Sequence, residues 1–285
     1  MIVDVWLVPI RPRPSWLGWL SEAERARAAR LAAPAGDVFV TSRALQRRWG
    51  AVAVGVPPAE VTIDRSCEHC GDPGHGRPRL PGAPAFSVSH TGRWLLLAAA
   101  SAGRLGADIE DPAAAADPTG LAGVVLSVAE HREFSAAPPD EQAGRLLTAW
   151  TRKEAAMKLA GLGLAAAPAR VDVRGRLACS DVPGWPREPV HLRPLAAPDG
   201  HVAALATTVP VAAVRRRELA ELATPDGVTA RSGRTGPAVR TRQPAIAATL
   251  TRPGVPTQPP EPRNPRSTAR ATTPPAPSPR PEPPS

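Results

Sequence analysis

The alternation of hydrophobic and polar residues predicts a series of short strands, and hydrophobic residues at three- and four-residue steps predict helices between them. Strands are expected at Ile2–Pro9, residues 61–64, Ala85–His90, Trp94–Ala100, Leu105–Glu110, and residues 171–174, 176–180, 190–194 and 201–208. Helices are expected at residues 22–32, 37–54, 127–134 and 140–161, with a last helical turn at residues 215–222. We expect Ala85–His90, Trp94–Ala100 and Leu105–Glu110 to form one antiparallel meander.

The order of these elements predicts an α+β fold with two halves, each with helices packed on an antiparallel sheet. The N-terminal half is predicted at residues 1–104 and the C-terminal half at residues 105–223. From about residue 224 the sequence becomes a mixture of proline, arginine, threonine and alanine with almost no large hydrophobic residue. Such a segment buries too little apolar surface to offset its ordering entropy, so residues 224–285 are predicted to be a disordered tail.

Charge and composition narrow the expected partners. The 285 residues carry a net charge of +9, and six of these charges come from the tail, where nine arginines face three acidic residues. The remainder is close to balanced, which argues against nucleic-acid binding. No hydrophobic run approaches the length of a membrane span, and no secretory signal is visible near the start. We therefore expect a cytoplasmic monomer that does not bind membranes.

The predicted helix at residues 140–161 carries the only two lysines of the chain, Lys153 and Lys158. Glu154 and Lys158 are four residues apart, so their side chains leave the same side of the helix. An exposed helical ion pair is the commonest meaning of this spacing. A lysine, however, is a compact cation that can titrate and can donate to a phosphate, and every other basic charge here is an arginine. A role in chemistry is therefore the second interpretation.

Asp108 and Glu110 are two residues apart in a predicted strand, so their side chains share one face, about 7 Å apart. Solvation at a strand end would explain them, and so would a hard cation such as Mg²⁺, which prefers oxygen ligands. With Glu154 and Lys158 they suit a magnesium-bound diphosphate. No glycine-rich nucleotide loop or nucleophile elbow is present. The residues therefore favour phosphoryl-group transfer from a phosphate-rich donor.

Three further groups each allow two interpretations. Arg43 and Arg47 share one helix face, which is either a solvated surface or an anion site. His90, at a strand end, is either structural or functional. A loop with two cysteines and two histidines is either a plain turn or a zinc site, although no second ligand pair follows at zinc-finger spacing. These loop residues are Cys67, His69, Cys70 and His75. The rival function is a non-catalytic zinc-loop protein that binds a polyanion.

Three segments in order resemble the signatures of the Sfp-type 4′-phosphopantetheinyl transferases: residues 86–90 (FSVSH), 106–110 (GADIE) and 150–158 (WTRKEAAMK). The resemblance extends over about residues 1–210. It implies a pseudo-twofold pair of α/β halves with coenzyme A (CoA) bound between them. It also implies magnesium-dependent transfer of the phosphopantetheine arm of CoA to a serine of an apo carrier protein, either acyl, polyketide or peptidyl. The second product would be adenosine 3′,5′-bisphosphate.

The resemblance also implies a role for each residue that matches a family position. Asp108, Glu110 and Glu154 would be the magnesium ligands, and Glu154 or a metal-bound water would be the base toward the incoming serine. Lys158 would contact the diphosphate and protonate the leaving group. The remaining matched positions would bind CoA: Ser89 and His90 at the phosphates, Arg43 at the 3′-phosphate, and Gly76, Arg77 and Pro78 near the adenine. Arg77 stands where the family usually has a lysine.

Overall fold

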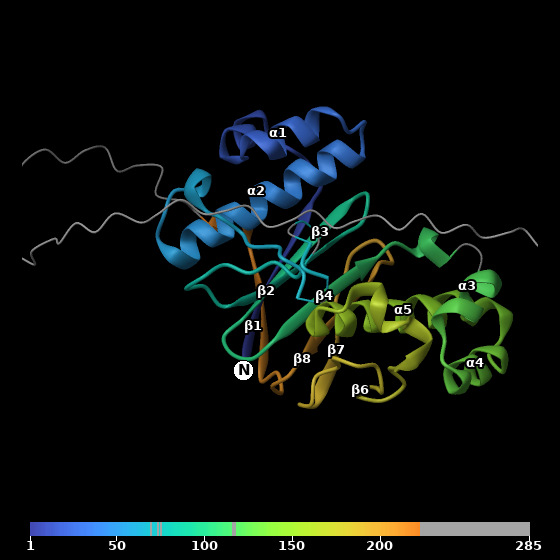
Figure 1. The fold of residues 1–285 in the computed structure, drawn as a ribbon. Coiled ribbons are helices and arrows are strands. Elements are labelled where there is room, and N and C mark those ends of the chain that lie inside the picture. The colour runs from blue at the N-terminus through green and yellow to red at the C-terminus, as the bar shows by residue number, and fades with distance from the viewer. Residues whose placement is uncertain (69, 73, 75, 116–117, 223–285) are drawn as a thin grey trace, which may run out of the picture. The chain divides into compact units, whose positions relative to one another are not determined.

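The computed structural model describes residues 1–222 except 69, 73, 75, 116 and 117, and these residues lie within one compact unit, Met1–Arg231. The described residues form two β-sheets with helices packed on them (Figure 1). The predicted mixed α+β class is therefore confirmed. The pseudo-twofold relation between the halves stays a prediction, and the predicted tail lies outside the described residues.

The first sheet has the strand order β2-β3-β1-β9, with β1 and β3 antiparallel and β1 and β9 parallel. Its strands are β1 (Ile2–Pro9), β2 (Ala85–His90), β3 (Trp94–Ala100) and β9 (Ala213–Arg217). One face is covered by α2 (Ala35–Val54), whose Leu45 and Trp49 pack on Trp6, Val8, Phe86, Leu95 and Leu97. A reciprocal capping box between Ser21 and Glu24 begins α1 (Glu22–Ala29).

The second sheet has the strand order β4-β8-β7-β6-β5 and is antiparallel throughout. Its strands are β4 (Leu105–Glu110), β5 (Val171–Asp172), β6 (Leu177–Ser180), β7 (Val190–Leu195) and β8 (Val202–Thr207). The long helix α5 (Pro139–Ala160) covers one face of this sheet, with α3 (Pro118–Val125) and α4 (Val128–Ser135) beside it (Figure 1). Helix α5 ends at Gly161, which adopts a left-handed conformation that glycine tolerates.

Short 3₁₀ turns complete the described secondary structure at Pro14–Trp19, Pro58–Glu60, Pro112–Ala115, Gly163–Ala166, Pro168–Arg170 and Leu219–Leu222. Among the described helices, none combines the length and the hydrophobicity that a membrane span requires.

Two sequence predictions about strands were wrong, and a predicted helical turn is present only at Leu219–Leu222. Leu105–Glu110 is not the third strand of a meander, because β3 already has β2 and β1 on its two edges, so β4 pairs with β8 instead. Residues 61–64 form no strand, and only Asp64 makes a single bridge, to Arg79. Residues 215–222 do not begin with a helical turn: Ala213–Arg217 extends along the edge of β1, where Arg215 and Arg217 both pair with Asp4.

The two sheets meet through the face of β4 that points away from α5. Leu105, Ala107 and Ile109 lie in one hydrophobic cluster with residues of the first sheet, namely Val3, Val5, Leu96, Ala98 and Ala100. The same alternation directs Gly106, Asp108 and Glu110 toward α5. A Cβ atom on Gly106 would lie 1.9 Å from the Ala155 carbonyl oxygen, so only glycine lets the helix approach this closely.

Candidate active site

Helix α5 presents one row of polar side chains to β4. Trp150, Glu154 and Lys158 recur every four residues, which places them along one side of the helix. At one end of the row, Lys158 Nζ lies 2.5 Å from Asp108 Oδ1. At the other end, Trp150 Nε1 donates a hydrogen bond to Glu110 Oε1 at 2.9 Å. The carboxylates predicted to share a strand face therefore do so, and the helix contacts both of them.

Asp108 is almost completely buried, with 1% of its surface exposed. Its Oδ1 accepts a hydrogen bond from Ser89 Oγ at 2.6 Å, and Lys158 Nζ also donates to Ser89 Oγ at 2.9 Å. Its second oxygen, Oδ2, is buried without any hydrogen-bond partner in the described part of the chain. A buried carboxylate oxygen without a partner is costly, so this atom marks a place where a cation or donor would be stabilised.

The raised pKa values of the cluster also indicate that it would be stabilised by a cation. Burial and the neighbouring charge of Asp108 raise the pKa of Glu110 to about 7. Burial also raises the pKa of Glu154, and the Asp108 charge adds to this effect while the Lys158 charge opposes it. Three carboxyl groups thus share one nearby ammonium group, and two of them resist ionisation because they are buried and because negative charge is in excess.

The residues present fit a divalent cation. Within the described ranges, no group of three His, Cys, Asp or Glu side chains is arranged as a finished metal site, and the Lys158 ammonium occupies Asp108 Oδ1. Asp108 Oδ2 is nevertheless free of partners, and no hydrogen bond or ion pair of the Glu154 side chain is present among the described residues. Carboxylate oxygens are the ligands that Mg²⁺ prefers. The predicted trio of Asp108, Glu110 and Glu154 therefore has suitable chemistry.

A second polar region is a cavity of about 740 Å³ between α2, the loop that follows it, and the end of β2. Its lining includes three of the predicted CoA residues, Arg43, Pro78 and His90. Arg27 and Arg65 also line it. Burial and the nearby Arg43 charge lower the pKa of Arg65 to about 10, and burial also lowers the pKa of Arg43. Clustered, partly buried guanidinium groups of this kind suit a phosphate.

The two arginines predicted to act together on α2 both pair with Glu24, Arg43 at 3.7 Å and Arg47 at 2.8 Å, but only Arg43 lines the cavity. Arg47 is buried, and its guanidinium donates to Glu24 Oε2 at 2.8 Å and to the Val61 carbonyl at 2.6 Å. Arg47 therefore links α2 to α1 and to the loop that follows α2. It is neither a solvated residue nor available to bind an anion. Arg65 takes the place beside Arg43 instead. Sequence reasoning missed Arg65 because it lies in a loop, where no periodicity indicates the direction of its side chain.

The three predicted adenine-binding residues, Gly76, Arg77 and Pro78, have different surroundings. A Cβ atom on Gly76 would lie 2.3 Å from the Ser66 carbonyl oxygen, and the Gly76 amide donates to Arg65 O at 2.6 Å, so this glycine fixes the loop that carries Arg65. Pro78 lines the Arg43 cavity. Arg77 instead donates to the Leu159 carbonyl at 3.3 Å and lines a separate cavity of about 460 Å³. The structure therefore does not bring Arg77 together with Arg43.

His90 and Ser89 connect the arginine-lined cavity to the carboxylates. His90 lines the cavity, whereas Ser89, its neighbour on β2, donates to Asp108. Burial and the Lys158 charge lower the pKa of His90. Since β2 and β4 belong to different sheets, this contact joins the two predicted halves. A further link is the Ala107 amide, which donates to Ser87 Oγ at 2.9 Å.

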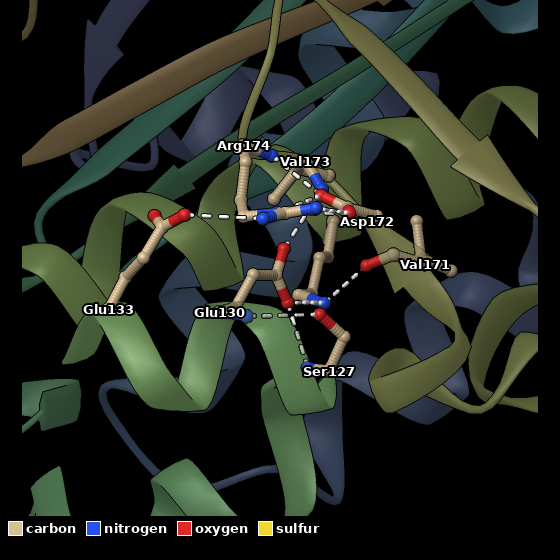
Figure 2. Close-up of polar contacts among 8 residues, drawn as sticks. Ser127, Glu130, Glu133, Val171, Asp172, Val173 and Arg174 are labelled. Atoms are coloured by element: carbon tan, nitrogen blue, oxygen red, sulfur yellow. Dashed lines mark hydrogen bonds and ion pairs between the residues drawn. The ribbon is translucent and has the colours of Figure 1, made fainter. Parts of the chain in front are cut away.

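The other lysine has a different environment. Lys153 is fully buried, its Nζ lies 2.6 Å from Glu130 Oε2, and it donates to the carbonyls of Pro168 and Val171. Figure 2 shows that Glu130 also accepts hydrogen bonds from the backbone amides of Ser127 and Val173. Every donor and acceptor of this pair is therefore used internally, so Lys153 is structural.

The zinc interpretation of the cysteine loop is not supported by the described residues. Cys67 is buried and Cys70 is exposed, and among the described residues neither belongs to a group of three His, Cys, Asp or Glu side chains that could hold a metal ion. The two candidate histidines, His69 and His75, lie outside the described residues.

Comparison with known proteins supports the family resemblance. Residues 104–189 match the model of the 4′-phosphopantetheinyl transferase superfamily. The chain is 40% identical over 76 residues to the 4′-phosphopantetheinyl transferase AcpT of Escherichia coli K12, which covers 27% of this chain and 39% of that protein. It is 30% identical over 131 residues to the 4′-phosphopantetheinyl transferase of Bacillus subtilis, which covers 45% of this chain and 51% of that protein.

A third relative, the AcpT enzyme of Salmonella typhimurium strain LT2, is 38% identical over 88 residues, or 30% of this chain and 46% of that protein. The matches thus span about half or less of the length of these relatives. The predicted resemblance is confirmed over residues 104–189, which include the second and third signatures. The matched family segment contains β4 and α5, the two elements that carry the carboxylates and Lys158.

Proposed function

We propose that this protein is a magnesium-dependent 4′-phosphopantetheinyl transferase, which moves the phosphopantetheine arm of CoA to a serine of an apo carrier protein. The observation that carries this proposal is the carboxylate cluster of β4 and α5, linked through Ser89 to a cavity lined by arginines. CoA has a diphosphate and a separate 3′-phosphate, so it matches one site for a metal-bound diphosphate and one for a second anion.

The cavity would hold the nucleotide end of CoA. Arg43 would bind the 3′-phosphate, and Arg65 would share this role because its guanidinium lines the same cavity. His90 would contact the phosphates from the end of β2, and Pro78 would lie near the adenine. Gly76 would act indirectly, since its close packing on Ser66 holds the loop of Arg65. For Arg77 we retain a place near the adenine as a proposal, at the edge of the neighbouring cavity.

The cluster would hold the diphosphate and the reacting atoms. Asp108, Glu110 and Glu154 would hold Mg²⁺, which when bound supplies neutralisation of the diphosphate charge. Lys158, now 2.5 Å from Asp108, would turn its ammonium toward the diphosphate and give a proton to the leaving 3′,5′-bisphosphate. Glu154 is the candidate base for the carrier serine, as the family resemblance implies, because a carboxylate in this cluster can accept the hydroxyl proton.

The remaining parts of the proposal follow from the family resemblance. We propose that CoA lies between two pseudo-twofold-related α/β halves, and that the substrate is an acyl, polyketide or peptidyl carrier protein of secondary metabolism. The rival function, a zinc-loop protein that binds a polyanion, gives no role to the buried carboxylates, whose burial costs stability.

The test is direct transfer. Purified protein, CoA and Mg²⁺ are incubated with several apo carrier proteins, and each carrier is analysed by intact-protein mass spectrometry. The expected result is a mass gain equal to one phosphopantetheine on the carrier serine, absent without Mg²⁺ and absent for the Asp108→Asn variant. No mass gain on any fatty-acid, polyketide or peptide-synthetase carrier would contradict the proposal.

The anion cavity has its own test. Dephospho-CoA lacks the 3′-phosphate, so the preference of the enzyme for CoA measures the contribution of this cavity. We expect Arg43→Gln and Arg65→Gln to reduce the preference about tenfold or more each, because each removes one charge-assisted contact. The matched control is Arg170→Gln, whose guanidinium pairs with Asp181 on an exposed surface. An unchanged preference in both variants would contradict the assignment of the cavity.

A further inference from the structure

Trp150 opens the third signature, residues 150–158, and its indole contacts a residue of the carboxylate cluster. Its indole N–H donates to Glu110 Oε1 at 2.9 Å, and Glu110 is a proposed metal ligand. We propose that Trp150 is a positioning residue for the metal site: its indole N–H holds one oxygen of Glu110 so that the other oxygen points to the cation. This inference rests on the proposed function, because it concerns the same cluster.

The row of polar side chains on α5 explains how a positioning residue would contribute to the metal site. Lys158 contacts Asp108 at one end and Trp150 contacts Glu110 at the other, whereas Glu154 lies between them on the helix. The two carboxylates of β4 are thus each held from the helix by a donor. A cation held by both carboxylates would lie next to the middle residue of the row, Glu154. The orphan Oδ2 of Asp108 is consistent with a ligand position there.

The indole is itself held in place. Trp150 packs against a hydrophobic cluster formed by α3, α4 and α5, whose buried members are Ala122, Val125, Leu126, Phe134 and Leu146. A large ring fixed by packing has one direction for its N–H, so the hydrogen bond restricts the rotamers of Glu110 before any cation arrives. Hydrogen bonds to metal-ligating groups that fix their orientation typically change metal affinity 10- to 100-fold.

The simpler explanation, that the bond merely satisfies a buried indole, is weaker in this fold. Trp6 Nε1 is buried without a hydrogen-bond partner in the described residues, so the fold tolerates an unsatisfied indole N–H. Trp94, at the start of β3, makes a bond of the same kind to Asp199 Oδ2 in a turn, at 3.0 Å and on an exposed surface. Trp94 therefore provides a matched control, since it has the same donor and acceptor types outside the carboxylate cluster.

The experiment compares Trp150→Phe with Trp94→Phe and with the unchanged chain. Phenylalanine keeps most of the packing and removes only the donor. Binding of Mn²⁺, a probe for the Mg²⁺ site, is measured by electron paramagnetic resonance with and without CoA. We expect Mn²⁺ affinity to fall about 10- to 100-fold in Trp150→Phe and to stay unchanged in Trp94→Phe. In the transfer assay, the Mg²⁺ concentration for half-maximal rate should rise by a similar factor, while the KM for CoA at saturating Mg²⁺ stays nearly constant.

A second variant separates positioning from folding. Trp150→His places another ring N–H donor on α5, so partial recovery of Mn²⁺ affinity relative to Trp150→Phe would support the hydrogen bond as the cause. Equal Mn²⁺ affinity in Trp150→Phe and the unchanged chain would overturn the inference, as would an equal loss in Trp94→Phe. Those results leave transfer by the unchanged chain intact. If instead the unchanged chain binds no Mn²⁺ and transfers no arm, the proposed function fails and this inference fails with it.

Discussion

Helix α5 carries both lysines of the chain, and the two lysines form ion pairs of opposite character. We call the Lys153–Glu130 pair closed, because its side chains are 0% and 5% exposed and backbone groups use the remaining donors and acceptors (Figure 2). We call the Lys158–Asp108 pair open, because the Lys158 side chain is 30% exposed and one buried oxygen of Asp108 has no hydrogen-bond partner among the described residues. The first pair is complete without any ligand, whereas the second has capacity left for one.

The difference shows that burial of a charge does not by itself indicate function. A buried pair whose every atom is satisfied joins α5 to α4 and to the start of β5, and so it stabilises the arrangement of the C-terminal elements. A pair with an unsatisfied oxygen beside two further carboxylates stores unfavourable charge that a cation relieves. The completeness of the hydrogen bonding therefore separates the structural lysine from the candidate catalytic lysine.

The largest expected effect comes from breaking the closed pair. Lys153→Met leaves the Glu130 carboxylate buried without its cation, and the free energy of unfolding should fall by about 3–5 kcal/mol. Urea unfolding followed by circular dichroism measures this loss. The double variant Lys153→Met, Glu130→Gln should recover part of it, because glutamine keeps an acceptor for the Val173 amide without the charge. A loss below about 1 kcal/mol would show that this pair does not stabilise the fold.

Breaking the open pair should affect chemistry more than folding. Lys158→Met should lower the free energy of unfolding by only about 1–2 kcal/mol, because Lys158 is partly exposed and Asp108 keeps its bond from Ser89. Transfer activity should fall about 10²- to 10³-fold, the usual cost of losing one preorganised group that stabilises developing charge. The assay compares kcat on an apo carrier, and activity close to that of the unchanged chain would remove Lys158 from the mechanism.

Asp108→Asn should separate stability from activity most clearly. The amide relieves repulsion with Glu110 and Glu154 but loses the ion pair with Lys158, so we expect the free energy of unfolding to change by less than about 1 kcal/mol. Transfer should become undetectable, since the central ligand of the proposed cation is gone. Melting temperature and carrier mass gain measured on the same preparation provide the check. Retained transfer would reject the metal assignment of Asp108.

A further effect should be a pH dependence of the metal-free protein. The folded pKa of Glu110, about 7, lies above its usual value of 4.5, so the folded chain keeps a proton that the unfolded chain releases. The stability that this proton provides is fully present below about pH 4.5 and is lost as the pH rises through about 7. Unfolding measured from pH 5 to 8 should show this slope, and Glu110→Gln should reduce it. Saturating Mg²⁺ should also flatten the slope, and an unaffected slope would argue against cation binding here.

The sequence predicted the local elements of the site well. The bounds of β1, β2, β3 and β4 were correct, and α5 differed from its prediction by one residue at each end. The shared face of Asp108 and Glu110, and the row of Glu154 and Lys158, are also present. These features depend on the two-residue repeat of a strand and the 3.6-residue repeat of a helix, which the sequence encodes directly. The sequence by itself therefore determined which residues could act together within one element.

The tertiary structure decided which elements meet. It moved β4 from the first sheet to the second, because β3 had no free edge, and it paired β9 with β1. It also placed Arg65, and not Arg47, in the cavity with Arg43, and it closed one lysine pair while leaving the other open. Such choices depend on contacts between residues far apart in the chain, where packing and available strand edges outweigh local preferences. No local repeat in the sequence records those contacts, so only the folded chain shows them.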